Sequence, residues 1–220
     1  MNIYQLEGNP REVTGKKASK TIRKEGLIPA ILYGQKPVEL PLKGGLNKGE
    51  KIVETGKDKG VVLTEFTITS DAVRNLIYTP HIYLVSLSLK GGRTVNAIVK
   101  DIQFHPVTDA ILHIDFLEVF DSKPIVMEVP VVLEGHAEGV KAGGKLNLEM
   151  RKLRVKALYD KMPERLVINV EKLGLGKTIQ VGELHFDNME LTNAKNSVVC
   201  SVKLTRAARG MEAAATTTTE

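Results

Sequence analysis

The sequence has 220 residues, of which 42% are hydrophobic and 26% charged, with a formal net charge of +5 and a pI near 9.2. This length accommodates one large domain or two of ordinary size, with enough apolar residues for a core. No stretch approaches the ~20 apolar residues of a membrane-spanning helix, so we expect no membrane partner. A basic chain is compatible with nucleic acid, although total charge alone does not establish such a partner.

The single cysteine, Cys200, excludes an intrachain disulfide and a zinc site built on cysteines. It lies in a β-branched run, residues 197–202, which favours a buried structural thiol over a nucleophile. The first five residues have neither the basic nor the apolar segment of a signal peptide. We therefore expect a cytoplasmic protein and no cofactor.

Short alternating and β-branched runs predict a mainly β fold, with a β-barrel-like first domain and a second β-rich domain. Two short helices are expected in the first domain: residues 16–24, between two glycines, and residues 70–78, capped by Ser70 or Asp71. Strands of the first domain are expected over residues 28–33, 38–42, 61–69, 82–89, 94–104 and 111–119.

Residues 43–60 hold five Lys, three acidic residues and five Gly without an apolar period. This composition predicts an exposed loop, with RNA contact as the minority interpretation. The pattern breaks at residues 121–124, where we place a boundary between domains over residues 1–120 and 121–207. The Ala- and Thr-rich tail, residues 208–220, should be disordered. Strands of the second domain are expected over residues 125–133, 152–158, 166–170 and 198–204.

Positive charge is concentrated in residues 11–24. Six cations against Glu12 alone give six minus one, or +5, which equals the net charge of the whole chain. On a helix, Lys16, Lys20 and Arg23 share one face, and Ser19 joins it. Adjacent like charges repel, so a phosphate-backbone contact explains the arrangement better than helix stability does, with a solvated basic helix as the alternative. The six cations are Arg11, Lys16, Lys17, Lys20, Arg23 and Lys24.

A second distinctive segment, residues 100–119, predicts two strands joined by a turn. His113 and Asp115 project to one face of the second strand, and Gln103 and His105 share a face of the first. Such a face forms either a structural hydrogen-bonded pair or a polar binding surface that reads base edges in the shallow RNA minor groove. Two alternatives remain: a metal site of His105, His113 and Asp115 serving a phosphoesterase, and a general acid–base pair. The spacing matches no metal motif and no nucleophile accompanies it.

Two blocks of this sequence resemble a known family. Residues 11–34 read Arg-(x)3-Gly-Lys-Lys-Ala-Ser-Lys-(x)2-Arg-(x)2-Gly-(x)2-Pro-Ala-Ile-Leu-Tyr-Gly, and residues 101–116 read Asp-Ile-Gln-x-His-Pro-(x)6-His-x-Asp-Phe. In this order, at opposite ends of one domain, they resemble the bacterial large-subunit ribosomal protein family number twenty-five. The second half resembles the additional β domain of its longer form, the general stress protein Ctc type.

The resemblance implies a structural constituent of the large ribosomal subunit, not an enzyme, that binds the loop E region of 5S rRNA through its N-terminal domain. Neighbouring ribosomal proteins are the implied partners of the C-terminal domain, and no small-molecule substrate is implied. Lys20 stands where some relatives have Arg, which exchanges a bidentate fork for a point charge. A stress protein that visits ribosomes only transiently is the alternative. The implied RNA-binding residues are Arg11, Lys16, Ser19, Lys20, Arg23, Tyr33, Gln103, His113 and Asp115.

Overall fold

The computed structural model describes residues 2–34, 38–39, 49–54, 59–90 and 93–205. The chain divides into two compact units, one ending at Lys123 and the other beginning at Pro124. The expected tail over residues 208–220 lies outside the described residues, as do residues 40–42 of one expected strand. Among the described helices, none is long and apolar enough to cross a membrane.

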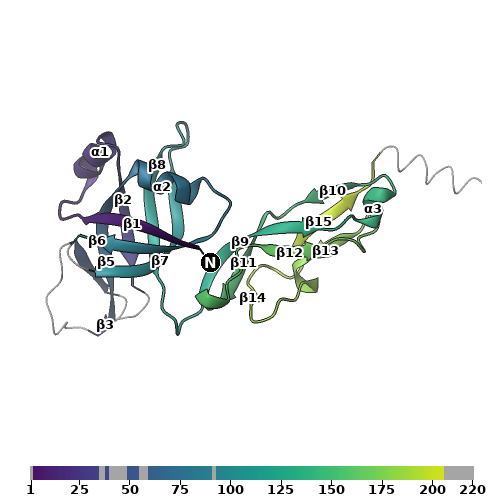
Figure 1. The fold of residues 1–220 in the computed structure, drawn as a ribbon. Helices are drawn as coiled ribbons and strands as arrows, with labels where there is room; N and C mark the ends of the chain where they lie inside the picture. The colour runs from purple at the N-terminus through teal and green to yellow at the C-terminus, as the bar shows by residue number, and fades with distance from the viewer. Residues whose placement is uncertain (1, 35–37, 40–48, 55–58, 91–92, 206–220) are drawn as a thin grey trace, which may run out of the picture. The chain divides into compact units, whose positions relative to one another are not determined.

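The first unit is built mainly of strands, with two short helices, as Figure 1 shows. The predicted mainly β fold class is confirmed, and the predicted strands and helices agree with the observed ones to within a few residues. The helices are α1 (Lys16–Lys24) and α2 (Ser70–Ile77). The strands are β1 (Asn2–Pro10), β2 (Leu27–Tyr33), β3 (Val38–Glu39), β4 (Glu50–Glu54), β5 (Lys59–Thr69), β6 (Tyr83–Leu89), β7 (Arg93–Phe104) and β8 (Ile111–Glu118).

Six of these strands close into a barrel. Their order is β1-β6-β7-β8-β2-β5, and β5 pairs back with β1 at Asn9 and Pro10. β1 runs parallel to β6, and β2 runs parallel to β8, whereas the other neighbours in the barrel are antiparallel. β3 and β4 pair with the first part of β5. The predicted barrel-like first domain is confirmed, and closure protects the strand edges that an open sheet would expose.

The barrel interior is filled by alternate side chains from its strands. On β2, Ala30 and Leu32 are buried, whereas Ile31 and Tyr33 face outward and are half-buried. Phe66 and Phe116 meet inside the barrel, with their ring centroids 5.8 Å apart. Because side chains alternate along a strand, filling the core with these residues places their neighbours on the outer surface.

Helix α1 is held at both ends by glycines and lies with one side against the barrel. Gly15 precedes it with φ 113° and Gly26 follows it with φ 76°, conformations that suit glycine. Ala18 and Ile22 are half-buried, and no residue of α1 is fully buried. The helix therefore displays most of its surface to solvent, and its predicted bounds are confirmed.

Two local predictions in this unit are wrong. The loop expected over residues 43–60 contains a strand, β4, which pairs along β5 because sheet formation outweighs the weak local pattern. Residues 43–48 and 55–58 of that loop lie outside the described residues. The expected cap of α2 at Ser70 or Asp71 is also wrong: Thr69 precedes the helix, in extended conformation, without a side-chain capping hydrogen bond.

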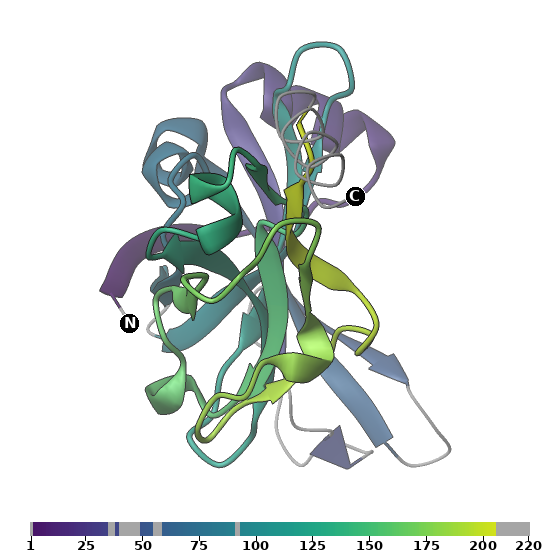
Figure 2. The same ribbon diagram turned by 90° about the vertical axis from the view of Figure 1, so that its right-hand side faces the viewer.

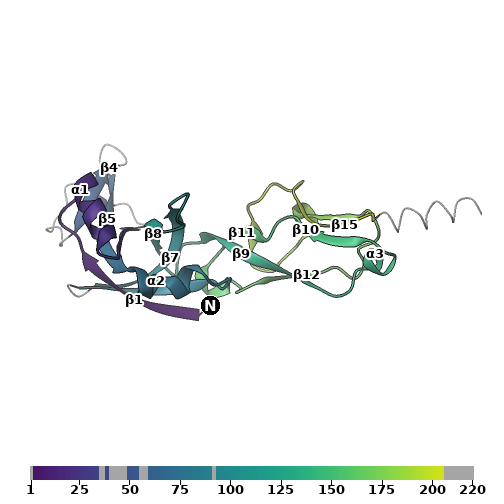
Figure 3. The ribbon, with the colours of Figure 1, turned by 90° about the horizontal axis from the view of Figure 1, so that it is seen from above.

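The second unit is also β-rich and forms two sheets, with strand orders β12-β9-β11-β14 and β10-β15-β13. Helix α3 lies beside β10 (Figure 3). The helical segments of the second unit are α3 (Glu138–Lys141) and two short 3-10 helices, η1 (Tyr159–Lys161) and η2 (Val181–Glu183). Its strands are β9 (Ile125–Glu134), β10 (Lys145–Leu148), β11 (Lys152–Ala157), β12 (Leu166–Asn169), β13 (Thr178–Gln180), β14 (Glu190–Leu191) and β15 (Val198–Lys203).

Burial explains the sequence pattern of this unit. In β11, Leu153, Val155 and Ala157 are buried while the intervening cations are exposed. β15 is buried at four successive positions, one of which is Cys200 with no exposed surface. Burial also raises the pKa of the Cys200 thiol, which keeps it protonated. The predicted structural role of this cysteine is therefore confirmed.

Candidate nucleic-acid interface

A bulge in β7 creates the polar face predicted on this hairpin. Val99 lies opposite Phe116, but Asp101 lies opposite Asp115, so Lys100 is an extra residue in the ladder. Val99 packs on the core, and Asp101 is exposed. Without the extra residue, side chains at 99 and 101 would share one face. The bulge therefore turns the last part of β7 so that its polar side chains face outward.

On this outer face, three predicted residues form one hydrogen-bonded group. The Tyr33 hydroxyl donates to Oδ2 of Asp115 over 2.7 Å, and His113 Nδ1 lies 2.6 Å from Oδ1 of the same carboxylate. The side chains of His113 and Asp115 are each 19% exposed. Because Asp115 accepts from both neighbours, it orients them, and His113 keeps Nε2 for a further contact. Gln103 lies directly across from His113 on β7 and is exposed.

The surroundings of Tyr33 keep its phenol protonated. Burial, the hydrogen bond to Asp115, and the negative charges of Asp115 and Asp101 together raise its pKa from 10.0 to about 12. Each of these effects disfavours the phenolate, because that anion would be desolvated next to carboxylates. Tyr33 is thus a hydrogen-bond donor throughout the neutral range.

Arg23 connects α1 to β8, the strand that carries His113 and Asp115. Its Nε donates a 3.0 Å hydrogen bond to the carbonyl oxygen of Leu112, the residue before His113. The side chain is otherwise exposed, so its remaining N–H groups stay available to an anion. This contact places the basic helix next to the group formed by Tyr33, His113 and Asp115.

The lysines of α1 are exposed and form no ion pair within the part of the chain that the structure describes. Unpaired cations that lie close together repel each other, and binding of a multivalent anion relieves this repulsion. Ser19 is half-buried, and its backbone amide donates to the carbonyl of Gly15. These exposed lysines are Lys16, Lys17, Lys20 and Lys24.

Arg11 differs from the other cations of the cluster because its side chain is largely covered and lies beside a carboxylate. Its Nε donates to the carbonyl of Val13 over 2.9 Å, and its Nη2 lies 3.7 Å from Oε2 of Glu65. Only 14% of the Arg11 side chain is exposed. Lys51 pairs with the other oxygen of Glu65 at 2.8 Å. Arg11 therefore holds the end of β1 against β5 and β4 as well as contributing charge.

The expectation that His105 shares a strand face with Gln103 is wrong. β7 ends at Phe104, and His105 lies in the turn, where its Nδ1 accepts from the amides of Val107 and Thr108 at 3.3 and 3.2 Å. The imidazole stabilises the turn instead of joining the polar face. Among the described residues, no group of three or more His, Cys, Asp and Glu side chains is placed to hold a metal ion.

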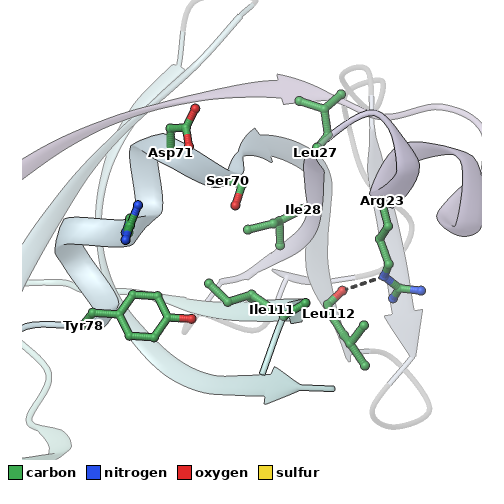
Figure 4. A pocket seen from close by; sticks show the side chains of 11 residues that line it. Arg23, Leu27, Ile28, Ser70, Asp71, Tyr78, Ile111 and Leu112 are labelled. Atoms are coloured by element: carbon green, nitrogen blue, oxygen red, sulfur yellow. Dashed lines mark hydrogen bonds between the residues drawn. The ribbon is translucent and has the colours of Figure 1, made fainter. Parts of the chain in front are cut away.

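Sequence reasoning did not assign any role to a second set of residues near α1. α1 and α2 lie near the turn between β7 and β8 (Figure 2), and a hollow of about 640 Å³ opens between these elements. Arg23 and Tyr78 line it, as Figure 4 shows. Arg74 of α2 lines it as well. The one feature of the sequence that could have indicated these residues is Tyr78, an aromatic residue directly before Thr79-Pro80, whose ring is exposed in the structure.

The exposed cations of α1 and the hydrogen-bonding groups of the sheet face thus lie next to each other on the surface of the first unit. Residues 6–116 match the model of the ribosomal L25p family, and residues 124–206 match that of the C-terminal domain of ribosomal protein TL5. The chain belongs to the ribosomal L25p family. This is a family of structural, non-enzymatic ribosomal components, and the phosphoesterase alternative is not favoured.

Three relatives extend the match over nearly the whole chain, and each is named large ribosomal subunit protein bL25. The protein of Porphyromonas gingivalis is 60% identical over 210 residues, covering 96% of this chain and 97% of the relative. That of Parabacteroides distasonis is 57% identical over 218 residues, with 97% and 99% covered. That of Bacteroides fragilis is 53% identical over 220 residues, with 98% and 99% covered.

Proposed function

We propose that the chain is a structural constituent of the large ribosomal subunit, in the cytoplasm, and that its first domain, residues 1–120, binds the loop E region of 5S rRNA. The names of the relatives support membership of the large subunit. The observation that carries the RNA proposal is the contact between Arg23 and the Leu112 carbonyl, which places an unpaired basic helix beside a polar sheet face. The proposed RNA-binding residues are Arg11, Lys16, Ser19, Lys20, Arg23, Tyr33, Gln103, His113 and Asp115.

The helix supplies affinity and position. Lys16, Lys20 and Arg23 lie on one face of α1 at i, i+4 and i+7 and are exposed. Contacts to phosphates release condensed counterions and carry no sequence information of their own. Ser19, on the same side, offers a hydroxyl to a phosphate oxygen.

The sheet face supplies recognition. His113 Nε2 and the amide of Gln103 offer hydrogen bonds to base edges or 2′-hydroxyls in a wide, shallow minor groove. Tyr33 and His113 are held in place by Asp115 before the RNA arrives, which lowers the entropy lost on binding. Asp115 thus acts chiefly as a positioning residue, and Arg11 combines charge with its bond to Glu65.

The second domain, residues 121–207, is proposed to contact neighbouring ribosomal proteins. Its match to a ribosomal C-terminal domain over residues 124–206 supports this role. Its surface cations are partly neutralised, since Arg154 pairs with Glu128 at 3.3 Å and Lys156 with Glu190 at 3.1 Å. A surface with paired charges suits a protein neighbour better than a phosphate backbone.

The test is the salt dependence of binding between the full chain and a 5S rRNA transcript. Each phosphate contact contributes a slope of roughly −0.7 to −0.9 in log K against log salt, so four contacts give about −3 to −4. Lys20→Ala combined with Arg23→Ala should flatten the slope by about 1.4 to 1.8. Arg165→Ala with Lys172→Ala removes the same charge from exposed positions of the second unit and should leave the slope unchanged. If the two double variants have equal slopes, α1 does not contact the phosphates of the RNA.

A further inference from the structure

The hollow beside α1 has two chemically different parts. Its volume is about 640 Å³, within the range of ~300–1,000 Å³ typical of small-ligand sites. Ile28 and Ile111 form its apolar floor, as Figure 4 shows. Arg23 from α1 and Arg74 from α2 also line it, so guanidinium groups contribute to its walls. An apolar floor with cationic walls suits a flat, anionic ligand.

Tyr78 gives the hollow an exposed aromatic wall. This side chain is 59% exposed, although most large apolar rings of the first unit are covered. Its backbone amide donates to the carbonyl of Arg74 at 3.0 Å, and its hydroxyl donates to the carbonyl of Asp109 at 3.4 Å. The ring is therefore held between the end of α2 and the β7–β8 turn. A fixed, exposed aromatic ring beside arginines is the combination on which splayed RNA bases stack.

Arg23 links this hollow to the proposed RNA surface. Its Nε is committed to the Leu112 carbonyl, and the same side chain lines the hollow. An RNA strand bound along α1 would therefore pass the opening of the hollow. Asp71 and Ser70, also in the lining, supply an acceptor and a hydroxyl for the edge of a base.

We propose that the hollow accepts one unstacked base of the RNA that binds α1, with the base against Tyr78 and Ile111 and its phosphate between Arg23 and Arg74. This inference rests on the proposed function and adds to it a single-nucleotide site outside the polar sheet face. It assigns Arg74 and Tyr78, two residues outside the basic helix and the hairpin, to RNA binding.

The chain has no Trp, so Tyr78→Trp introduces a single Trp fluorophore into the hollow. Binding to end-labelled 5S rRNA is followed by anisotropy, and Trp emission is recorded in the same titration. Saturation with RNA should quench the emission of Tyr78→Trp by at least about twofold, because an indole stacked on a base is strongly quenched. Val167→Trp, at an exposed position of the second unit, is the matched control and should change little.

Affinity gives the second readout. Tyr78→Ala should weaken 5S rRNA binding roughly 5- to 100-fold, the range expected for loss of one base–aromatic stack. Because Tyr78 is exposed, the variant should keep the melting temperature of the parent. Arg74→Ala should weaken binding less and should flatten the salt slope by about one contact.

The outcomes separate the two proposals. Unchanged Tyr78→Trp emission with full RNA binding overturns the base site and leaves the proposed function standing. Absence of any binding to 5S rRNA overturns both. Full affinity of Tyr78→Ala for RNA, together with reduced occupancy on large subunits, would assign the hollow to a protein neighbour and overturn the inference.

Discussion

Tyr33 on β2 and Asp115 on β8 are joined by a 2.7 Å hydrogen bond between the phenol and Oδ2. The two residues are 82 positions apart in sequence, and parallel pairing of β2 with β8 brings them together. The bond ties two strands of the barrel on its outer face. It also fixes the direction of the carboxylate that His113 contacts.

Removal of the Tyr33 hydroxyl should change how stability depends on pH. The pKa of Tyr33 is raised from 10.0 to about 12 in the folded chain, chiefly by burial and then by Asp115. A folded pKa above the unfolded value means that the stabilisation is fully present below pH 10 and is lost as pH rises through about 12. The free energy of unfolding of the parent should fall more steeply over this interval than that of Tyr33→Phe.

The check for Tyr33 is urea unfolding at a series of alkaline pH values, with absorbance at the tyrosinate band recorded in parallel. One late-titrating tyrosine should disappear in Tyr33→Phe. If both proteins lose stability in parallel and the absorbance curves coincide, the phenol of Tyr33 is not held protonated by burial and Asp115.

His113 and Asp115 should act on RNA affinity as one unit. If Asp115 orients His113, then either substitution by Ala removes most of the contribution of the pair. The double variant should lose less affinity than the sum of the single losses, with a coupling of about 0.5–3 kcal/mol. The measurement is a double-mutant cycle on 5S rRNA binding. If the affinity lost by the double variant equals the sum of the two single losses to within about 0.5 kcal/mol, the two residues contact RNA independently.

Deletion of Lys100 should be far more harmful than removal of its side chain. Deletion removes the register shift between Val99 and Asp101 and drives either Val99 out of the core or Asp101 into it. We expect a loss of about 3 kcal/mol or more in the free energy of unfolding, since a charge or an apolar group is placed on the wrong face. Lys100→Ala, at an exposed position, should stay within about 0.5 kcal/mol. Similar stability of both variants would refute the role given to the bulge.

Gly49→Ala should destabilise the junction of β1, β4 and β5. Gly49 has φ +78°, and an added Cβ would lie 2.6 Å from the Glu65 carbonyl oxygen and 3.2 Å from the amide of Arg11. Backbone strain and overpacking together predict a loss of about 2–5 kcal/mol. Gly26→Ala is the matched control, because Gly26 has φ +76° with nothing within 4 Å of the added Cβ. Backbone strain alone should lower the free energy of unfolding of Gly26→Ala by about 1–2 kcal/mol. Equal melting temperatures of Gly49→Ala and Gly26→Ala would exclude a steric clash at Gly49.

Local sequence patterns predicted much of the first unit because its strands alternate strongly. β8 is the clearest case, since Ile114 and Phe116 alternate with His113 and Asp115. β1 was not predicted, because Leu6 and Gly8 are its fully buried positions and polar residues surround them. Its place depends on pairing with β6, far along the chain, which a local pattern does not contain.

The polar group around Asp115 was only partly predictable. Strand alternation placed His113 beside Asp115, but Tyr33 joins them through the parallel pairing of β2 with β8. The outward direction of Asp101 depends on the bulge at Lys100, and no glycine or other turn-forming residue marks this bulge in the sequence. His105 was misplaced because it lies beyond the end of β7 at Phe104, where its imidazole accepts hydrogen bonds from its own turn. Strand pairing decided the positions of Tyr33 and Asp101, whereas hydrogen bonds within the turn decided that of His105.

The most direct test of the central claim compares two RNAs with the full chain at one salt concentration. One is intact 5S rRNA, and the other is the same RNA with the non-Watson–Crick pairs of loop E replaced by Watson–Crick pairs. We predict that the intact RNA binds at least about tenfold tighter, because base-edge contacts discriminate by ~1–3 kcal/mol each. Equal affinity for both RNAs would contradict recognition of loop E by the Tyr33, Gln103 and His113 face.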